Sequence, residues 1–182
     1  MSALHKFLAV LLLLAGWSIP AAAQESILKI GDAAPDFSLV GSDGKTYKLA
    51  DFKDKQAVVV AWFPRAFTRG CTAECASFAK DGAKIRAFDV AYFTASTDAA
   101  DQNKKFAESA DVKADYPILS DPTAKTAQAY GIYNADNKAA ARVTFYIGKD
   151  GKIKHIDRMI RTAMAAGDVA AKLKELGVDA KK

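Results

Sequence analysis

The sequence predicts an α/β domain built on a mixed β-sheet. Two apolar runs of strand length, 57–63 and 90–96, alternate with segments in which apolar residues recur at helical spacing. Two other segments, 37–49 and 142–157, place turn residues between β-prone runs, as hairpins do. Strands that alternate with helices favour parallel pairs and hairpins add antiparallel ones, so one sheet should contain both.

The chain begins with a segment typical of a secretory signal peptide. Lys6 precedes an unbroken apolar run, 7–15, and Ala21–Ala23 form a small-residue cleavage site. The run is shorter than the ~20 apolar residues that a membrane-spanning helix needs. We therefore expect a signal peptide over 1–23, one globular domain over 24–182, and no stable membrane insertion after cleavage.

Export would place the domain outside the cytoplasmic membrane, in the periplasm if the cell has two membranes, where disulfides persist. Lys6 is the only one of the 26 basic residues in the leader, so the domain has 25 basic and 21 acidic residues, a net charge of +4. Basic and acidic residues are interspersed, which argues against nucleic acid as a partner.

The N-terminal half should contain a hairpin, a buried strand and a long helix. The hairpin, 37–49, turns at Asp43-Gly44, and the continuous apolar run 57–63 is typical of a strand covered on both faces. After a short loop, apolar side chains recur as on one face of a helix, at Cys71, Cys75, Phe78, Ala79 and Ile85.

The C-terminal half continues the alternation. The second apolar strand precedes a helix over 97–110, for which Thr97 is the expected N-cap. A connection with a short apolar run, a short helix ending near Gly131 and a hairpin turned at Asp150-Gly151 follow. The last helix, 167–177, should have a capped start and a glycine stop.

The only two cysteines, Cys71 and Cys75, lie where the first buried strand leads into the long helix. Cys71 should occupy the first helical turn, where unpaired backbone amides and the positive end of the helix dipole stabilise a thiolate. An exposed thiolate is a nucleophile. Arg65 and Arg69 in the same loop either add positive charge beside it or point into solvent. Cys75 lies one turn deeper, so Cys71 is the better candidate for attack.

The spacing of the two cysteines restricts how they can bond. Residues four apart share a helix face with Cβ atoms roughly 5–6 Å apart, whereas a disulfide needs about 3.5–4.5 Å. Cys71 and Cys75 can therefore bond only if the helical turn partly unwinds. Two interpretations of Cys75 stay open: a resolving cysteine that bonds Cys71 after its oxidation, or a small buried hydrophobe on the apolar face.

Pro64 and Thr68 precede Cys71 in the same loop. Pro64 fixes its own φ and lacks an N–H, so it can stiffen the loop and shield the sulfur. The Thr68 hydroxyl can reach the thiolate or a substrate, although threonine is also an ordinary helix cap. Together with Cys71, directly after a buried strand, these residues predict a thiol-based active site.

The segment "PRAFTRGC", 64–71, resembles the P-x-x-x-T-x-x-C active-site motif of the peroxiredoxins. Within that family, "GCTAEC" is similar to the bacterioferritin-comigratory-protein group, the Q type. The similarity extends from "GDAAPDFSL" through "YPILSDPTAKTAQAYGI" to "RVTFYIGKDGKI", and so covers nearly all of the expected domain. It implies a thioredoxin-like fold, with the mixed sheet flanked by helices and an N-terminal β-hairpin.

The resemblance implies an enzyme, a thiol-dependent peroxidase that reduces hydrogen peroxide and small organic hydroperoxides without a metal or organic cofactor. Cys71 would be the peroxidatic cysteine, which becomes a sulfenic acid. Thr68 would hydrogen-bond the peroxide and the thiolate, and Pro64 would cover the sulfur. Arg142, in "RVTF", would hold the thiolate and offset charge on the departing oxygen, and Glu74 would orient Arg142.

One interval departs from the family pattern. The Q-type group usually places its resolving cysteine five residues after the peroxidatic one, whereas Cys75 lies four after Cys71. If Cys75 does not resolve, an external thiol reductant, either a thioredoxin-like protein or a small thiol, must act directly on oxidised Cys71. A monomer and a dimer are both compatible with the sequence.

Other function classes fit parts of the sequence. The Sco copper-delivery proteins share the fold and show C-x-x-x-C with a downstream histidine, so Cys71, Cys75 and His155 could supply a copper site. That family has proline where this chain has Ala76, however, and copper binding gives the loop proline and threonine no role. A non-catalytic binding module would leave the same residues unexplained, and the C-x-x-C of general thiol–disulfide exchange proteins is absent.

Overall fold

The computed structural model describes residues 27–181, so the predicted signal peptide, residues 1–23, lies outside the described residues. The strands are β1 (Ser38–Gly41), β2 (Thr46–Lys48), β3 (Ala57–Trp62), β4 (Val90–Ser96), β5 (Ile118–Ser120), β6 (Tyr133–Asn134), β7 (Ala139–Ala140), β8 (Val143–Ile147) and β9 (Ile153–Asp157). The helices are α1 (Arg69–Arg86), α2 (Ala100–Glu108), α3 (Lys125–Ala129) and α4 (Ala165–Glu175), with short 3-10 helices η1 (Leu49–Phe52) and η2 (Thr162–Met164).

Seven of the strands form one sheet in the order β2-β1-β5-β4-β3-β8-β9, and β6 and β7 form a separate pair. The pairs β3-β4 and β4-β5 are parallel, whereas β1-β2, β1-β5, β3-β8 and β8-β9 are antiparallel. The predicted mixed sheet is therefore confirmed, and so is the N-terminal hairpin, β1-β2. None of the helices in residues 27–181 is both long and apolar enough to cross a membrane.

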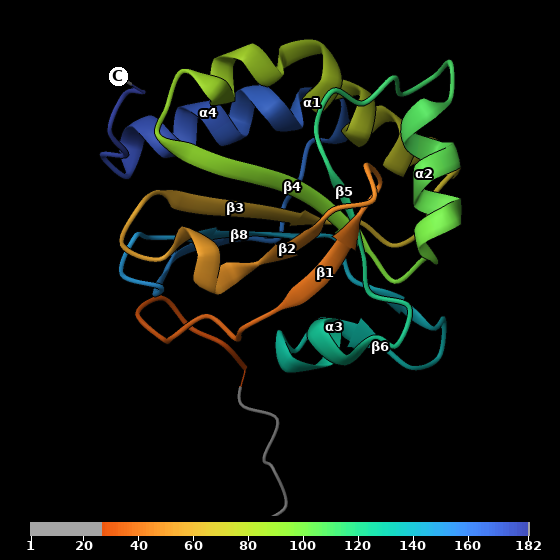
Figure 1. Ribbon diagram of the computed structural model, residues 1–182, viewed down its shortest axis with the longest axis horizontal. Coiled ribbons are helices and arrows are strands. Elements are labelled where there is room, and N and C mark those ends of the chain that lie inside the picture. The colour runs from red at the N-terminus through yellow and green to blue at the C-terminus, as the bar shows by residue number, and fades with distance from the viewer. Residues whose placement is uncertain (1–26, 182) are drawn as a thin grey trace, which may run out of the picture.

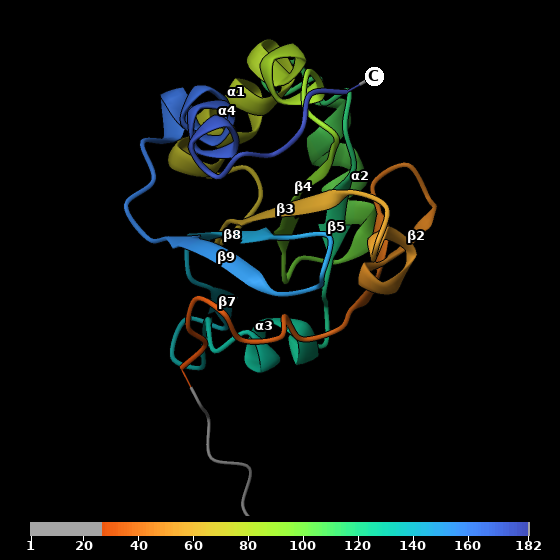
Figure 2. The ribbon, with the colours of Figure 1, turned by 90° about the vertical axis from the view of Figure 1, so that its left-hand side faces the viewer.

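Helices cover both faces of the sheet. Figure 1 shows α1 and α4 side by side over one face, and α3 with β6 over the other. Figure 2, turned by 90°, shows the same two layers with the sheet between them. In β3, Val59 and Ala61 pack toward α1 and α4, whereas Val58, Val60 and Trp62 pack into the second core. The continuous apolar run is thus buried on both faces, as predicted.

Two turns confirm the predicted hairpins. Gly44 joins β1 to β2 with φ +81°, and Gly151 joins β8 to β9 with φ +72°. Glycine adopts this left-handed backbone conformation without the steric cost that a side chain would bring. The prediction of a short helix ending near Gly131 is also confirmed, because α3 ends at Ala129 and Gly131 has φ +63°.

The start of α2 differs from the prediction. Its N-cap is Ala99, not Thr97, and no side chain caps its first turn. The Asp98 N–H donates to Ser96 Oγ at 3.2 Å, in a turn that delays the helix by two residues. A cap prediction from residue type was wrong here because the polar residues at the strand end bond one another instead.

The start of α4 was also predicted wrongly. The helix begins at Ala165, after η2, so Gly167 and Asp168 lie inside its first turn and not at a capped start. The Asp168 carboxylate accepts from the Arg161 Nε at 3.0 Å, so it is engaged with a side chain outside the helix. The glycine stop is confirmed, since α4 ends at Glu175 and Gly177 has φ +69°.

The topology brings the end of β3 and the start of β8 to one edge of the sheet. Because β8 runs antiparallel to β3, Trp62 pairs with Val143. The residue before β8, Arg142, therefore lies beside the loop 63–68 that follows β3. That loop leads directly into α1 at Arg69. Arg142 is therefore a neighbour of this segment, 63–68, which we call the cysteine loop because it precedes Cys71, although the two are distant in sequence.

Candidate active site

Cys71 is the third residue of α1. The first bond along the helix is donated by the Thr72 N–H to the Thr68 carbonyl, at 2.8 Å. In the part of the chain that the structure describes, no acceptor is bonded to the preceding three amides, those of Arg69, Gly70 and Cys71. Free amides and the positive end of the helix dipole stabilise negative charge next to the Cys71 sulfur.

The Arg142 guanidinium lies over this first turn. Its Nη2 donates to Cys71 Sγ at 3.2 Å, and its Nη1 donates to Glu74 Oε2. A Cβ atom added at Gly70 would approach Arg142 Nη2 to 3.3 Å, which is tighter than usual contact. Gly70 thus gives the guanidinium room to approach the helix. The structure brings together Cys71, Glu74 and Arg142, three of the residues singled out from the sequence.

Glu74 fixes the position of the guanidinium. The residue is fully buried, whereas 22% of the Arg142 side chain is exposed. The second carboxylate oxygen, Oε1, has no hydrogen-bond partner within residues 27–181. A buried carboxylate with one cationic partner resists any movement that removes that partner, since the charge would then be left uncompensated.

We expected Cys71 to present an exposed thiolate, and this expectation was wrong. Only 1% of the residue is accessible to solvent. It belongs to the core cluster that includes Phe63, Ala66 and Cys75, and the partly exposed Arg142 covers its sulfur. The residues around a helix start predict that negative charge is favoured there. They do not predict whether a side chain distant in sequence, here Arg142, covers the sulfur.

Thr68 is the N-cap residue of α1, but its side chain does not cap the helix. Its hydroxyl donates to the Arg65 carbonyl at 3.0 Å, which leaves the oxygen lone pairs available to accept a bond. Pro64 is half-buried at the start of the same loop. Arg65 donates to the Asn137 carbonyl at 3.0 Å, so its guanidinium is held by the turn between β6 and β7.

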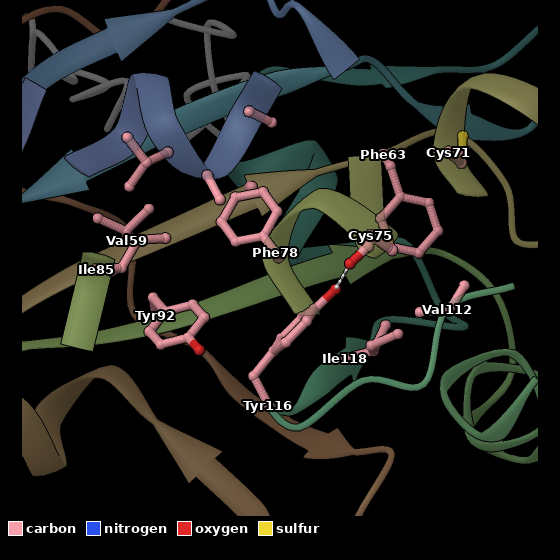
Figure 3. Packing of buried hydrophobic residues seen from close by; sticks show 14 of the residues in the cluster. Val59, Phe63, Cys71, Cys75, Phe78, Ile85, Tyr92, Val112, Tyr116 and Ile118 are labelled. Carbon is pink, nitrogen blue, oxygen red and sulfur yellow. Dashed lines mark hydrogen bonds between the residues drawn. The ribbon is translucent and has the colours of Figure 1, made fainter. Parts of the chain in front are cut away.

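Cys75 lies on the next turn of α1 and is completely buried. Burial raises the pKa of its thiol to about 12, an effect that the neighbouring Cys71 reinforces and that hydrogen bonds with Tyr116 and Thr94 reduce. Figure 3 shows Phe63 beside Cys75 and the bond between the Tyr116 hydroxyl and the Cys75 carbonyl. In this bond the hydroxyl donates to the carbonyl at 2.9 Å. The thiol itself contacts Thr94 Oγ1 at 3.8 Å.

Both cysteines are free thiols and α1 is continuous through them. The helical geometry keeps two residues on successive turns too far apart for a disulfide. A bond between Cys71 and Cys75 therefore requires α1 to unwind locally. The apolar surroundings of Cys75 agree with its interpretation as a small buried hydrophobe.

His155 does not join the cysteines. It lies on β9, with its ring 5.4 Å from the Tyr146 ring, and burial followed by the charge of Lys172 lowers its pKa. Among residues 27–181, no three His, Cys, Asp or Glu side chains are arranged to hold a metal ion. The predicted copper set of Cys71, Cys75 and His155 is therefore not assembled.

Sequence reasoning missed two residues near the cysteine loop. Gly70 was passed over because a glycine in a first helical turn has no side chain to suggest a role. Asp98 was interpreted only as part of a helix start, but its carboxylate accepts the Ala66 N–H of the loop at 2.7 Å. The available signal was a cluster of short polar residues, "STDAADQN", directly after a buried strand.

The chain is similar in sequence and fold to known proteins. Residues 30–156 match the model of the AhpC/TSA family. The peroxiredoxin Bcp of Escherichia coli (strain K12) is 31% identical over 135 residues, which cover 71% of this chain and 85% of the relative. The peroxiredoxin Bcp of Bacillus subtilis (strain 168) is 27% identical over 155 residues, or 82% of this chain and 97% of the relative.

Solved structures show the same fold. Peroxidoxin BcpB from Mycobacterium tuberculosis superposes with a TM-score of 0.72 at 28% identity, covering 81% of this chain and 97% of that one. A cysteine-to-serine mutant of PrxQ from Xylella fastidiosa superposes with a TM-score of 0.74 at 22% identity, covering 84% and 99%. The predicted thioredoxin-like fold, a mixed sheet flanked by helices, is thus confirmed.

Proposed function

This chain belongs to the AhpC/TSA family and is a peroxiredoxin of the Bcp group, a thiol-dependent peroxidase, and we propose that Cys71 is its peroxidatic cysteine. The observation that carries the assignment is the contact between Arg142 Nη2 and Cys71 Sγ at the start of α1. Cys75, the only other thiol, is buried in the apolar core with a pKa of about 12, so it stays protonated and unreactive at neutral pH.

In the first step the Cys71 thiolate attacks the terminal oxygen of a hydroperoxide. A sulfur–oxygen bond forms as the O–O bond breaks, sulfur loses two electrons, and the departing alkoxide or hydroxide takes up a proton to leave as an alcohol or water. The Arg142 guanidinium stabilises the thiolate before the step and the negative charge on oxygen during it. Cys71 becomes a sulfenic acid.

The remaining site residues position this step. Glu74 holds the guanidinium with a charge-assisted bond, so the cation is oriented before the peroxide arrives. The Thr68 oxygen accepts a hydrogen bond from the peroxide O–H, since its own O–H already donates to the Arg65 carbonyl. Pro64 restricts the loop and limits the access of water to the sulfur.

An external thiol returns Cys71 to the reduced state. The thiolate of a thioredoxin-like protein or a small thiol attacks the sulfenic sulfur and releases water, and a second thiol breaks the mixed disulfide. The sum is one hydroperoxide and two thiols converted to an alcohol, water and a disulfide. Resolution by Cys75 is the second route, and it is open only when α1 unwinds around Cys71 and Cys75.

The substrates that fit this chemistry are hydrogen peroxide and small organic hydroperoxides. The steps use only the residues of the site, the peroxide and the reducing thiol. We also propose export to the periplasm, which rests on the leader-like residues 1–23 and would expose the enzyme to peroxide from outside the cell. The oligomeric state, monomer or dimer, does not enter the mechanism.

The assignment is tested by peroxide consumption with dithiothreitol as the reductant. Cys71→Ser should abolish consumption, because no other thiol in the chain has the Arg142 contact. Cys75→Ser is the matched control and should retain the wild-type rate. Consumption that survives in Cys71→Ser, or is lost only in Cys75→Ser, would overturn the assignment.

The route of resolution is tested on the same proteins. Wild-type protein treated with one equivalent of peroxide and then alkylated is digested and analysed by mass spectrometry. A Cys71–Cys75 bridge in most chains would establish the internal route. Unbridged Cys71 oxidation products, with Cys75 still a thiol, would establish direct reduction by an external thiol.

A further inference from the structure

We propose that Asp98 is a positioning residue of the peroxidase reaction, because its buried carboxylate fixes the loop that carries Pro64 and Thr68. The inference rests on the proposed function of Cys71. Asp98 is 8% exposed and lies just after β4, whereas the loop follows the neighbouring strand, β3. Asp98 Oδ2 accepts the Ala66 N–H at 2.7 Å, so the segment after β4 holds the loop that follows the neighbouring strand β3.

A buried polar network in turn holds the Asp98 carboxylate. Ser96 Oγ donates to Asp98 Oδ2 at 3.0 Å. Asn103, on α2, donates from Nδ2 to Ser96 Oγ at 3.0 Å and to Ser120 Oγ at 2.9 Å. All three supporting residues are buried. The network joins β4, α2 and β5, so the carboxylate that holds Ala66 has a fixed position of its own.

The loop needs such a restraint because its backbone is strained. Phe67, the residue after Ala66, has φ +64°, a left-handed conformation that bulky side chains rarely adopt. Such conformations persist only where the surrounding structure imposes them. Phe67 is 56% exposed, and the centroid of its ring lies 5.0 Å from that of Phe106. A half-exposed ring contact gives little directional control, so a buried bond to the adjacent amide is the stronger restraint.

The other polar ties of the loop are on its surface. The bond from Arg65 to the Asn137 carbonyl and the bond from the Thr68 hydroxyl to the Arg65 carbonyl are both exposed to solvent. Within the described residues, the Ala66–Asp98 bond is the buried side-chain tie of the segment 64–68. It also involves a carboxylate, and hydrogen bonds to charged groups are stronger than neutral ones, most of all away from water.

Loss of the Asp98 bond should affect the positioning of the peroxide more than the reactivity of the Cys71 sulfur. Ala66 and Phe67 lie between the two residues of the Arg65–Thr68 bond, so the position of Ala66 sets the orientation of the Thr68 hydroxyl. The Cys71 thiolate is stabilised separately, by Arg142 and the α1 amides. Loss of the Asp98 bond should therefore misplace the peroxide, while the reactivity of Cys71 toward a reagent that does not use Thr68 is kept.

Two rates measured on each variant test whether Asp98 affects the positioning of the peroxide and not the reactivity of Cys71. One is the single-turnover rate of Cys71 oxidation by hydrogen peroxide, and the other is the rate of Cys71 alkylation by iodoacetamide, both in a Cys75→Ser background. Asp98→Ala should lower the peroxide rate at least tenfold, while the alkylation rate stays the same or rises. Asp98→Asn should restore most of the peroxide rate, because an amide oxygen can still accept the Ala66 N–H.

Asp121 provides the matched control. It is a buried carboxylate that accepts a backbone N–H at 2.8 Å, but the N–H belongs to Ala127 in α3 and not to the cysteine loop. Asp121→Ala should leave the ratio of the two rates at the wild-type value. If Asp98→Ala does not fold, Ser96→Ala, which removes only the supporting hydroxyl, should lower the same ratio to a smaller extent.

The outcomes separate the two proposals. The positioning role would be overturned if Asp98→Ala left the ratio of the two rates unchanged, or if Asp98→Asn did not recover the peroxide rate. Either result would leave the peroxidase assignment intact. A similar fall of the ratio in Asp121→Ala would also overturn the positioning role. Absence of peroxide oxidation at Cys71 in the parent protein would refute the proposed function itself.

Discussion

Arg142 contacts the Cys71 sulfur with one guanidinium nitrogen and the Glu74 carboxylate with another. A planar guanidinium can make both contacts at once, whereas the ammonium of lysine is a compact point charge on a flexible stem. The charge on the sulfur and the orientation of the cation thus depend on one side chain. Glu74 is buried and needs this partner, so in the proposed mechanism the same pair contributes to stability and to reactivity.

Arg142→Met should slow the oxidation of Cys71 by peroxide by roughly 10²–10³-fold, the usual loss when a positioned donor to a developing oxyanion is removed. It should also lower the free energy of unfolding by roughly 3 kcal/mol, because Glu74 is left buried without a partner. Stopped-flow oxidation and urea denaturation measure the two effects.

Two further variants control this prediction. Arg142→Lys keeps the charge but not the double contact, so its rate should lie between those of the wild type and Arg142→Met. In the double variant Arg142→Met with Glu74→Gln, most of the stability should return but not the rate. A lysine variant that reacts at the wild-type rate would show that the two-nitrogen contact is unimportant.

α1 carries the site at one end and is packed into the core along its length. Its first turn holds Cys71, and Tyr116 bonds its second turn at the Cys75 carbonyl. Further along, Gly82 is buried close to Tyr92: a Cβ atom added there would lie 2.6 Å from the Tyr92 hydroxyl. A glycine inside a helix normally costs stability relative to alanine, so at Gly82 the close packing explains its presence.

The same substitution in two helices should therefore have opposite effects. Gly82→Ala should lower the free energy of unfolding by roughly 1–3 kcal/mol, because the rigid Tyr92 ring must move. Gly167→Ala, in α4, meets no atom within 4 Å and should raise the free energy of unfolding by roughly 0.5–1 kcal/mol. Urea denaturation of both variants checks this, and stabilisation by Gly82→Ala would contradict the packing argument.

The elements and the site differ in how far the sequence predicts them. Apolar runs, Asp-Gly turns and helical spacing predict the strands, hairpins and α1, because these signals act between residues close in sequence. The starts of α2 and α4 were missed because other bonds replace capping: Ser96 Oγ accepts the Asp98 N–H before α2, and the Asp168 carboxylate accepts from Arg161 in α4. The place of Arg142 depends on the register that pairs Trp62 with Val143, which no local pattern encodes, and only the family resemblance pointed to it.

Several buried groups, spread over different elements, stay neutral at pH values where they would ionise in the unfolded chain. Burial raises the pKa of Cys75 from its ordinary 9.0 to about 12, and it also raises the pKa of Tyr116, Tyr130 and Tyr146. A raised pKa of an acid contributes stability that is complete below the unfolded pKa and is lost as the pH rises toward the folded pKa. The free energy of unfolding should therefore fall above about pH 9.

Cys75→Ala measures how much the Cys75 thiol contributes to this fall in the free energy of unfolding at alkaline pH. Between about pH 8 and about pH 10.5, ionisation of the Cys75 thiol in the unfolded chain should cost the wild type roughly 2 kcal/mol. The variant is less stable at every pH because of the cavity it leaves, but its loss over this interval should be smaller by that amount. Urea denaturation at the two pH values measures the difference, and parallel losses in both proteins would contradict the buried, neutral state of Cys75.

We propose that peroxide oxidises the sulfur of Cys71, which Arg142 contacts at the start of α1. The most direct measurement treats the Cys75→Ser protein with one equivalent of hydrogen peroxide in the presence of a dimedone-type sulfenic acid probe, and maps the adduct by mass spectrometry. We predict one adduct per chain, on Cys71, formed at the rate of peroxide loss. Peroxide consumed at the wild-type rate without an adduct on Cys71 would contradict the claim.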